Sequence, residues 1–141
     1  MLKPFVKTNK IYFSIIWHSS FYILHLKIPS SRNLKKLNLT FNQIDDISGL
    51  KFFKKSSHSL HHVQLYSNRL NSLTHVIESL SQCTCLQNIE FRNGKNVNPI
   101  NGIPAYRTNI LTRLPWLKQL DGTDKNGNKI SNSSHASDIP G

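Results

Sequence analysis

The stretch that decides the fold is Leu34-Lys35-Lys36-Leu37-Asn38-Leu39-Thr40-Phe41-Asn42-Gln43-Ile44. Its pattern of leucine-like residues with one asparagine returns 26 residues later, beginning at Leu60, and again, less completely, at Leu86. The second copy keeps the asparagine at the matching offset, as Asn68. Ordinary amphipathic helices, with a period of 3.6 residues, would rarely reproduce that offset. The chain therefore contains a structural repeat.

The repeated spacing Leu-x-x-Leu-x-Leu-x-x-Asn-x-Leu is the leucine-rich repeat pattern. Leu37 and Leu39 stand two residues apart, so a short strand points both side chains toward one face, which becomes the core. Asn42 and Asn68 can hydrogen-bond backbone groups of neighbouring coils at the bend. We predict an α/β leucine-rich repeat solenoid, a short horseshoe fragment of about three repeats plus a C-terminal cap.

The end of the array also has a readable pattern. The third copy loses its register after Gly94, and we expect the array to end there. Farther on, Ile110, Leu111 and Leu114 share one helical face, and a last strand is expected around Leu117-x-x-Leu120. Such a helix and strand would cap the terminal coil and hide its core from water.

We predict three parts: an atypical or disordered lead segment (1–30), the repeats with their cap (31–122) and a disordered polar tail (123–141). In the lead segment, three lysines precede an apolar, aromatic stretch from Ile11 to Leu26. Three interpretations stay open for it: a secretory signal or membrane anchor, an apolar cover over the first coil in which Phe21-x-x-Leu24-x-Leu26 imitates a repeat strand, or an unrelated lead sequence. A membrane location is not favoured, because polar residues interrupt a stretch that is short for a bilayer.

The 141 residues carry a formal net charge of +11, from 18 lysines and arginines against 7 acidic residues. These cations are spread along the chain, so we interpret the excess as a generally solvated surface, with RNA binding as the alternative. Cys83 and Cys85 are spaced poorly for a disulfide, which favours reduced cysteines and an intracellular protein. No metal site or cofactor is predicted, because His58, His61 and His62 should lie on other coils and faces than the cysteines.

The expected partner-binding surface is the concave face, where residues between the strand leucines point. Its predicted members are Lys36, Asn38, Thr40, His62, Gln64, Tyr66, Asn88, Glu90 and Arg92. An aromatic anchor with positive neighbours suits an acidic peptide or helix of a protein partner, whereas the alternative is a merely solvated strand face.

Two other patterns in the sequence bear on function. The run Lys51-Phe52-Phe53-Lys54-Lys55 could hold single-stranded nucleic acid, but we favour phenylalanines that fill the first coil. No phosphate loop, nucleophile elbow or metal-ligand set is apparent, and Asp45 and Asp46 are expected to be surface charges. We therefore predict a protein that is not an enzyme.

The cap resembles that of short intracellular leucine-rich repeat proteins, a group that includes the A-prime protein of the U2 spliceosomal particle. A narrower resemblance covers about residues 33–122 and points to the leucine-rich repeat and coiled-coil domain-containing centrosomal protein family. Its segments are 42–50 (NQIDDISGL), 65–70 (LYSNRL), Asn98-Pro99 and 104–107 (PAYR).

This resemblance implies a non-enzymatic cytoplasmic protein that associates with centrosomal proteins at the centrosome, centriole, basal body or mitotic spindle. The sequence departs from the family in having no heptads after residue 122, so anchoring through a coiled coil is in doubt. Two alternatives remain: an RNA-particle adaptor resembling the A-prime protein, and a secreted or membrane-tethered repeat protein, for which glycosylation at Asn38 or Asn132 would be the mark.

Overall fold

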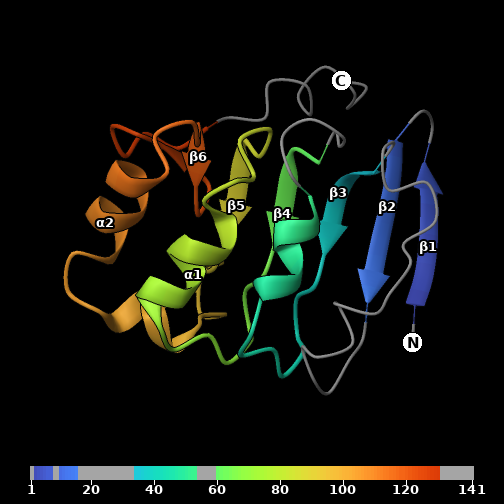
Figure 1. Cartoon of the computed structure of the whole chain (residues 1–141), viewed down its shortest axis with the longest axis horizontal. Coiled ribbons are helices and arrows are strands. Elements are labelled where there is room, and N and C mark those ends of the chain that lie inside the picture. Colours follow the sequence, from blue (N-terminus) through green and yellow to red (C-terminus); the bar gives the residue numbers. More distant parts are fainter. Residues whose placement is uncertain (1, 8–9, 16–33, 54–59, 131–141) are drawn as a thin grey trace, which may run out of the picture.

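The computed structural model describes residues 2–7, 10–15, 34–53 and 60–130. Seven strands form one sheet in chain order: β1 (Leu2–Lys7), β2 (Lys10–Ile15), β3 (Leu34–Asn38), β4 (His62–Gln64), β5 (Asn88–Glu90), β6 (Gln119–Leu120) and β7 (Thr123–Asp124). Strands β2 to β6 pair in parallel, and the outermost pairs β1–β2 and β6–β7 are antiparallel. Figure 1 shows these strands side by side, as expected for a solenoid that adds one strand per coil.

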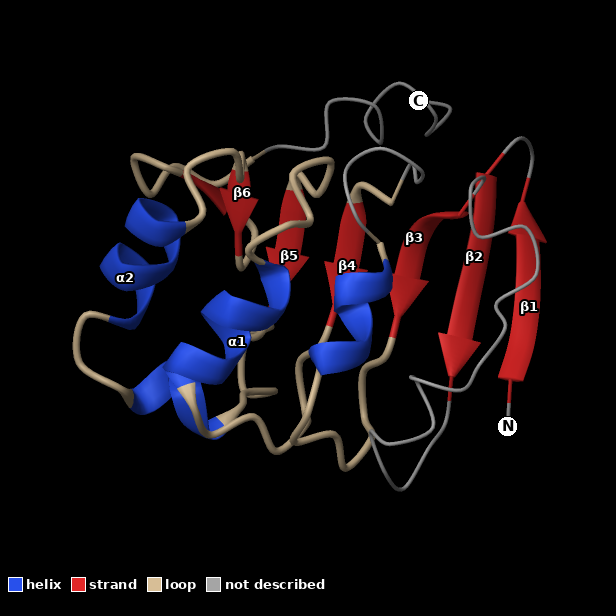
Figure 2. Ribbon diagram, in the orientation of Figure 1, coloured by secondary structure: helices blue, strands red, loops and turns tan. Residues whose placement is uncertain are grey.

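Helical segments cover one side of the sheet (Figure 2). They are the 3-10 helices η3 (Ser48–Phe52) and η4 (Pro99–Gly102) and the α-helices α1 (Leu73–Leu80) and α2 (Tyr106–Arg113). Helix α1 begins where the Ser72 hydroxyl accepts a hydrogen bond from the backbone N–H of His75, at 3.2 Å. Its Val76, Ile77 and Leu80 are buried, as an amphipathic helix on the core requires.

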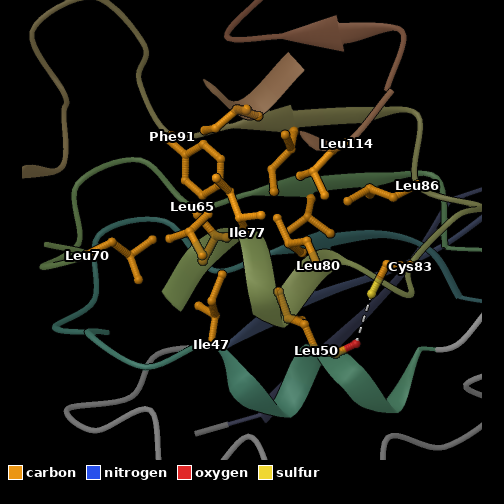
Figure 3. Close-up of a cluster of buried hydrophobic side chains, with 14 of the residues drawn as sticks. Ile47, Leu50, Leu65, Leu70, Ile77, Leu80, Cys83, Leu86, Phe91 and Leu114 are labelled. Atoms are coloured by element: carbon orange, nitrogen blue, oxygen red, sulfur yellow. Dashed lines mark hydrogen bonds between the residues drawn. The ribbon is translucent and has the colours of Figure 1, made fainter. Parts of the chain in front are cut away.

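The core lies between the sheet and these helices (Figure 3). On the strand side, the repeat positions Leu37, Leu39, Val63, Leu65 and Ile89 are at most 1% exposed. Next to them the Cys83 Sγ donates to the carbonyl of Leu50 at 3.2 Å, and burial raises the pKa of this thiol to about 11. The predicted inward face of the repeat is therefore confirmed.

Asparagine side chains connect one coil to the next. The Asn68 amide donates to the carbonyls of Leu39 and Leu65, at 2.9 Å each, and its Oδ1 accepts from the backbone N–H of Ile44 at 3.0 Å. Asn42 donates to the carbonyl of Leu39 within its own coil, also at 2.9 Å. The scaffold role predicted for the two asparagines is confirmed, and for Asn68 it spans two coils.

The array ends with the third coil, as expected, but the repeat pattern continues past Gly94. Asn98 repeats the role of Asn68, because its amide donates to the carbonyls of Leu65 and Phe91 and its Oδ1 accepts from the N–H of Leu70. Ile100 follows at the matching offset and is fully buried. The third coil is thus complete but longer, because the four residues 93–96 form a loop whose ends, Asn93 and Asn96, hydrogen-bond each other.

A cap follows the third coil, as the sequence predicts. Ile110 and Leu114 are fully buried, and Leu111 packs against the core while partly exposed. Asp121 joins the cap to the coil: its Oδ1 accepts from the N–H groups of Phe91 and Arg92, at 2.7 and 3.1 Å, and its Oδ2 accepts from the Tyr106 hydroxyl at 2.7 Å.

Both ends of the sheet differ from the expected parts of the chain. Residues 2–7 and 10–15 form strands that continue the sheet, although we expected an atypical or disordered segment. After residue 122, β7 and its turn are held by hydrogen bonds from Arg107 to the carbonyls of Leu120 and Asp124, so 123–130 is not a disordered tail. Residues 16–33, with the motif around Phe21, and residues 131–141 lie outside the described residues.

Asn42, Asn68 and Asn98, whose amides bind backbone carbonyls at successive bends, form an asparagine ladder. This ladder yields the first prediction. Asn68→Ala leaves the buried N–H of Ile44 without its acceptor and removes one of the two asparagine donors to each of the Leu39 and Leu65 carbonyls. We therefore expect a loss of about 1–3 kcal/mol in the free energy of unfolding. Asn68→Asp keeps the acceptor but loses both donated bonds, and it should also destabilise. Urea unfolding measures both, with the exposed Asn71→Ala as a control expected to change stability by less than about 0.5 kcal/mol. Equal effects for Asn68→Ala and Asn71→Ala would contradict the ladder.

The cap yields a second prediction. Asp121→Ala removes the acceptor of two backbone N–H groups and of the Tyr106 hydroxyl, and it should cost about 2–3 kcal/mol. Asp121→Asn retains an acceptor oxygen and, like aspartate, tolerates the positive φ of 52° found here, so it should cost less than half as much. Thermal unfolding of the two variants compares them, and an asparagine variant as unstable as the alanine variant would rule out this role.

Candidate functional site

The structure places all nine predicted concave-face residues on the side of the sheet opposite the core. Along β4 the burial pattern alternates, with His62 and Gln64 partly exposed and Val63 buried, and β5 alternates in the same way. The strand register aligns equivalent positions in rows across the coils, such as Lys36, His62 and Asn88. No described helix lies on this side of the sheet (Figure 2), so the alignment produces a continuous polar surface.

An acid–imidazole pair lies at the centre of this surface. The His62 Nε2 and the Glu90 Oε2 are 2.6 Å apart and join adjacent coils. Burial raises the pKa of Glu90, but hydrogen bonds from His62 and Gln64 and the charges of His62 and Lys36 outweigh it, so the pKa lies below its usual value. Glu90 is the one carboxylate among the nine concave-face residues, and its negative charge faces these partners.

A small pocket of about 140 Å³ opens beside this pair. Its walls come from β4, β5, β6 and the closing hairpin: His62, Asn88, Ile89, Glu90, Gln119, Gly122 and Ile130. We did not predict Gln119 as a surface residue, although its place in Leu117-x-x-Leu120 matches that of Asn88 in Leu86-x-x-Ile89. The polar surface therefore extends by one strand into the cap.

At the carboxyl ends of the strands the surface becomes aromatic. The rings of Phe41 and Tyr66 meet edge to face, with centroids 5.7 Å apart and planes at 87°. Phe41 is 64% exposed, and we did not predict it because the repeat pattern leaves its position unspecified. The neighbouring Asn38 and Thr40 side chains are hydrogen-bonded to each other, because the Thr40 hydroxyl donates to the Asn38 Oδ1 at 2.7 Å.

The other sequence candidates do not assemble into a chemical site. Of the basic-aromatic run, Lys51 is exposed and Phe53 is buried as favoured, while Lys54, Lys55 and the Phe52 side chain lie outside the described part. Asp46 accepts from the N–H of Ser48 at 2.8 Å, and its Oδ1 lies 3.4 Å from the His75 Nε2. Burial raises the pKa of Asp46, but the bonds from Ser48 and the charges of His75 and Lys51 lower it overall, which suits a turn carboxylate.

The described residues hold neither a metal-binding group of three ligands nor a helix that could span a membrane. Within 2–7, 10–15, 34–53 and 60–130, no three histidine, cysteine or acidic side chains gather as a metal-binding group; His58 lies outside these ranges. Cys83 is a buried thiol and Cys85 a partly exposed one, and the two are not joined in a disulfide. None of the helices in the described ranges has both the length and the apolar content needed to cross a bilayer.

No family model matches the chain. Three curated relatives called Leucine-rich repeat and coiled-coil domain-containing protein 1 are similar to it. The Xenopus laevis protein is 38% identical over 75 residues (53% of this chain, 7% of that protein). The Homo sapiens protein is 34% identical over 64 residues (45% and 6%), and the Mus musculus protein 36% over 99 residues (67% and 9%). The predicted resemblance is confirmed, and the chain spans less than a tenth of the length of these relatives.

Solved structures share the fold. The crystal structure of the Drosophila melanogaster SNF/U2A' complex matches with a TM-score of 0.58 and 24% identity, over 92% of this chain and 65% of that chain. The structure of the Chaetomium Mex67:Mtr2 subunits matches with a TM-score of 0.59 and 18% identity, over 92% and 86%. Both are leucine-rich repeat folds, so the predicted α/β leucine-rich repeat solenoid is confirmed.

The acid–imidazole pair generates a prediction about pH. Because the pKa of Glu90 is lower in the folded than in the unfolded chain, its ionised form stabilises the fold at neutral pH, and this contribution is lost as the pH falls through the folded pKa. The stability difference between the natural protein and Glu90→Gln should therefore be present above the unfolded-state pKa of Glu90 and be lost as the pH falls through its lowered folded pKa. Urea unfolding across this range measures it, with exposed Glu78→Gln as the control. A difference that persists in full once glutamate carboxyls are protonated would contradict the assignment.

Proposed function

We propose that this chain is a non-catalytic protein-interaction module that binds a protein partner through the concave face. The observation that carries the proposal is the side of the sheet opposite the core. Its polar side chains form rows across three coils, with a partly exposed tyrosine among them, and no described helix covers it. A rigid solenoid that presents aligned side chains on an open sheet is suited to docking another protein.

We further propose that the module works in a scaffold associated with centrosomes or centrioles and helps to organise the centrosome and the mitotic spindle. Support comes from the likeness to the leucine-rich repeat and coiled-coil domain-containing proteins, which covers 53% of this chain for the Xenopus laevis relative and 67% for the Mus musculus relative. In this scaffold the repeat module would recognise a centrosomal protein in the cytoplasm, at the centriole or basal body.

A second candidate is an adaptor in an RNA–protein particle. Two observations favour it: the net charge of +11 and the fold shared with a chain of the SNF/U2A' complex. Binding dominated by phosphate contacts would weaken steeply with added salt. We rank it second because the cations do not gather in one stripe and the residues on the central strands are mostly uncharged.

Cellular location tests the proposal. We expect the tagged 141-residue chain to form foci at a centriole marker, and His62→Ala/Gln64→Ala to lose them because two central side chains of the docking face are removed. The matched control, Thr74→Ala/Glu78→Ala, changes exposed positions of α1 and should keep the foci. Circular dichroism melting confirms that both variants fold.

Other locations would each overturn the centrosomal proposal. Foci at a nuclear-speckle marker, with RNA affinity that falls steeply with salt, would establish the adaptor. Endoplasmic reticulum staining with glycosylation at Asn38 or Asn132 would establish a secreted or membrane-tethered protein. Foci that survive in the His62→Ala/Gln64→Ala variant would show that the concave face does not provide the targeting contact.

A further inference from the structure

Two large hydrophobic residues in the described ranges are strongly exposed: Phe41 at 64% and Val97 at 44%. They occupy matching places in the sequence, because each directly precedes an asparagine of the ladder, Asn42 or Asn98, although only Phe41 of the two has a left-handed backbone. The corresponding residue of the middle coil is Ser67. Single exposed apolar residues are common on protein surfaces, but two at the same repeat position make a line that crosses the coils.

The fold itself does not require an aromatic side chain at position 41. Phe41 and Ser67 have the same left-handed backbone, with φ of 58° at both, so the turn accepts a small polar residue equally well. A bulky residue is disfavoured in this conformation. The ring of Phe41 nevertheless remains mostly exposed against Tyr66, which gives an apolar contact surface rather than core packing.

The charges around this line have one predominant sign. Arg69 lies two residues after Ser67, Lys95 lies two residues before Val97, and Arg92 occupies the third-coil position beside Tyr66; all three are exposed. None of them forms an ion pair with a described carboxylate. An apolar line flanked by cations that form no ion pair with a described carboxylate complements a partner with an apolar stripe and acidic neighbours.

The spacing of the line selects the form of that partner. Phe41 and Val97 are two coils apart, which corresponds to about 10 Å at about 4.8 Å per strand. Two turns of an α-helix advance about 11 Å, so apolar side chains seven residues apart on a helix can reach both ends of the line. A side chain halfway between them would meet Ser67 and Tyr66.

We propose that Phe41, Tyr66 and Val97, flanked by Arg69, Arg92 and Lys95, form a docking ledge for an acidic amphipathic helix of a protein partner. This inference rests on the proposed function and names the partner chemistry of that surface. The helix lies across the carboxyl ends of β3, β4 and β5, with its apolar stripe on the ledge and its carboxylates toward the three cations.

The test uses synthetic probes and the complete 141-residue chain. Three fluorescein-labelled helical peptides are compared by anisotropy at physiological salt: leucines at helical spacing in a glutamate background, the same leucines in a lysine background, and the glutamate background with the leucines replaced by alanine. We expect the first peptide to bind at least about tenfold more tightly than either of the others. Similar affinities for all three would overturn the proposal.

Variants then locate the contact. Phe41→Asn suits the left-handed backbone and should leave the melting temperature unchanged or higher, while it weakens binding of the acidic leucine peptide about tenfold. Val97→Ser should weaken binding in the same direction, Phe41→Tyr should retain it, and Thr112→Asn on the exposed side of α2 is the control. Full binding by both Phe41→Asn and Val97→Ser would overturn the ledge.

The ledge and the proposed function fail in different ways. If Phe41→Asn and Val97→Ser leave centriole foci intact while His62→Ala/Gln64→Ala abolishes them, the docking face is correct and the ledge is wrong. If the ledge variants lose peptide binding but the natural chain forms no centriole foci, the ledge stands and the centrosomal role is wrong.

Discussion

The hydrogen bonds of the buried asparagine amides set the geometry on which the rest of this molecule depends. At each bend after a strand, backbone groups turn away from the sheet ladder inside a core that offers them no water. One amide supplies both donors and an acceptor, so Asn68 ties the carbonyls of Leu39 and Leu65 to the N–H of Ile44. A carboxylate could only accept these bonds, and a hydroxyl has a single hydrogen to donate.

The ladder fixes the functional surface because it fixes the relation between coils. Asn98 makes the same three kinds of bond one coil farther along, and the strand register places Lys36, His62 and Asn88 beside one another. The polar rows of the concave face and the line from Phe41 to Val97 both follow from this repetition. A surface made in this way can gain or lose one side chain per coil without changing the backbone, as Phe41 and Ser67 illustrate with equal φ angles.

The sequence predicts the repeat correctly where the spacing of its leucines and asparagines is regular. The pairs Leu37–Leu39 and Val63–Leu65, with their asparagines, predict strand, core face and bend together. The third coil was misjudged because the self-closing loop 93–96 separates Phe91 from Asn98, and pattern matching at fixed offsets cannot detect a loop that leaves the ladder intact. The strands at 2–15 and 123–124 have no repeat signal, since their pairing depends on contacts with β3 and β6. The concave side chains were predictable from alternation, whereas Phe41 was not, because its exposure results from a turn conformation that no spacing rule marks.

The positive charge of the candidate surface follows from where the acidic residues are used: most of their carboxylates accept hydrogen bonds elsewhere in the fold. Asp121 accepts from two backbone N–H groups and a tyrosine, Asp124 accepts from the N–H groups of Asn126 and Asn128, and Asp46 accepts from that of Ser48. Glu90 is hydrogen-bonded to His62. Most of the few carboxylates are thus committed to turns, the cap and one inter-coil pair, while the side chains of Arg69, Arg92 and Lys95 form no ion pair with a described carboxylate. A positive surface therefore emerges without a basic cluster in the sequence, which is why the spread of lysines and arginines along the chain was a poor guide to where an acidic partner would bind.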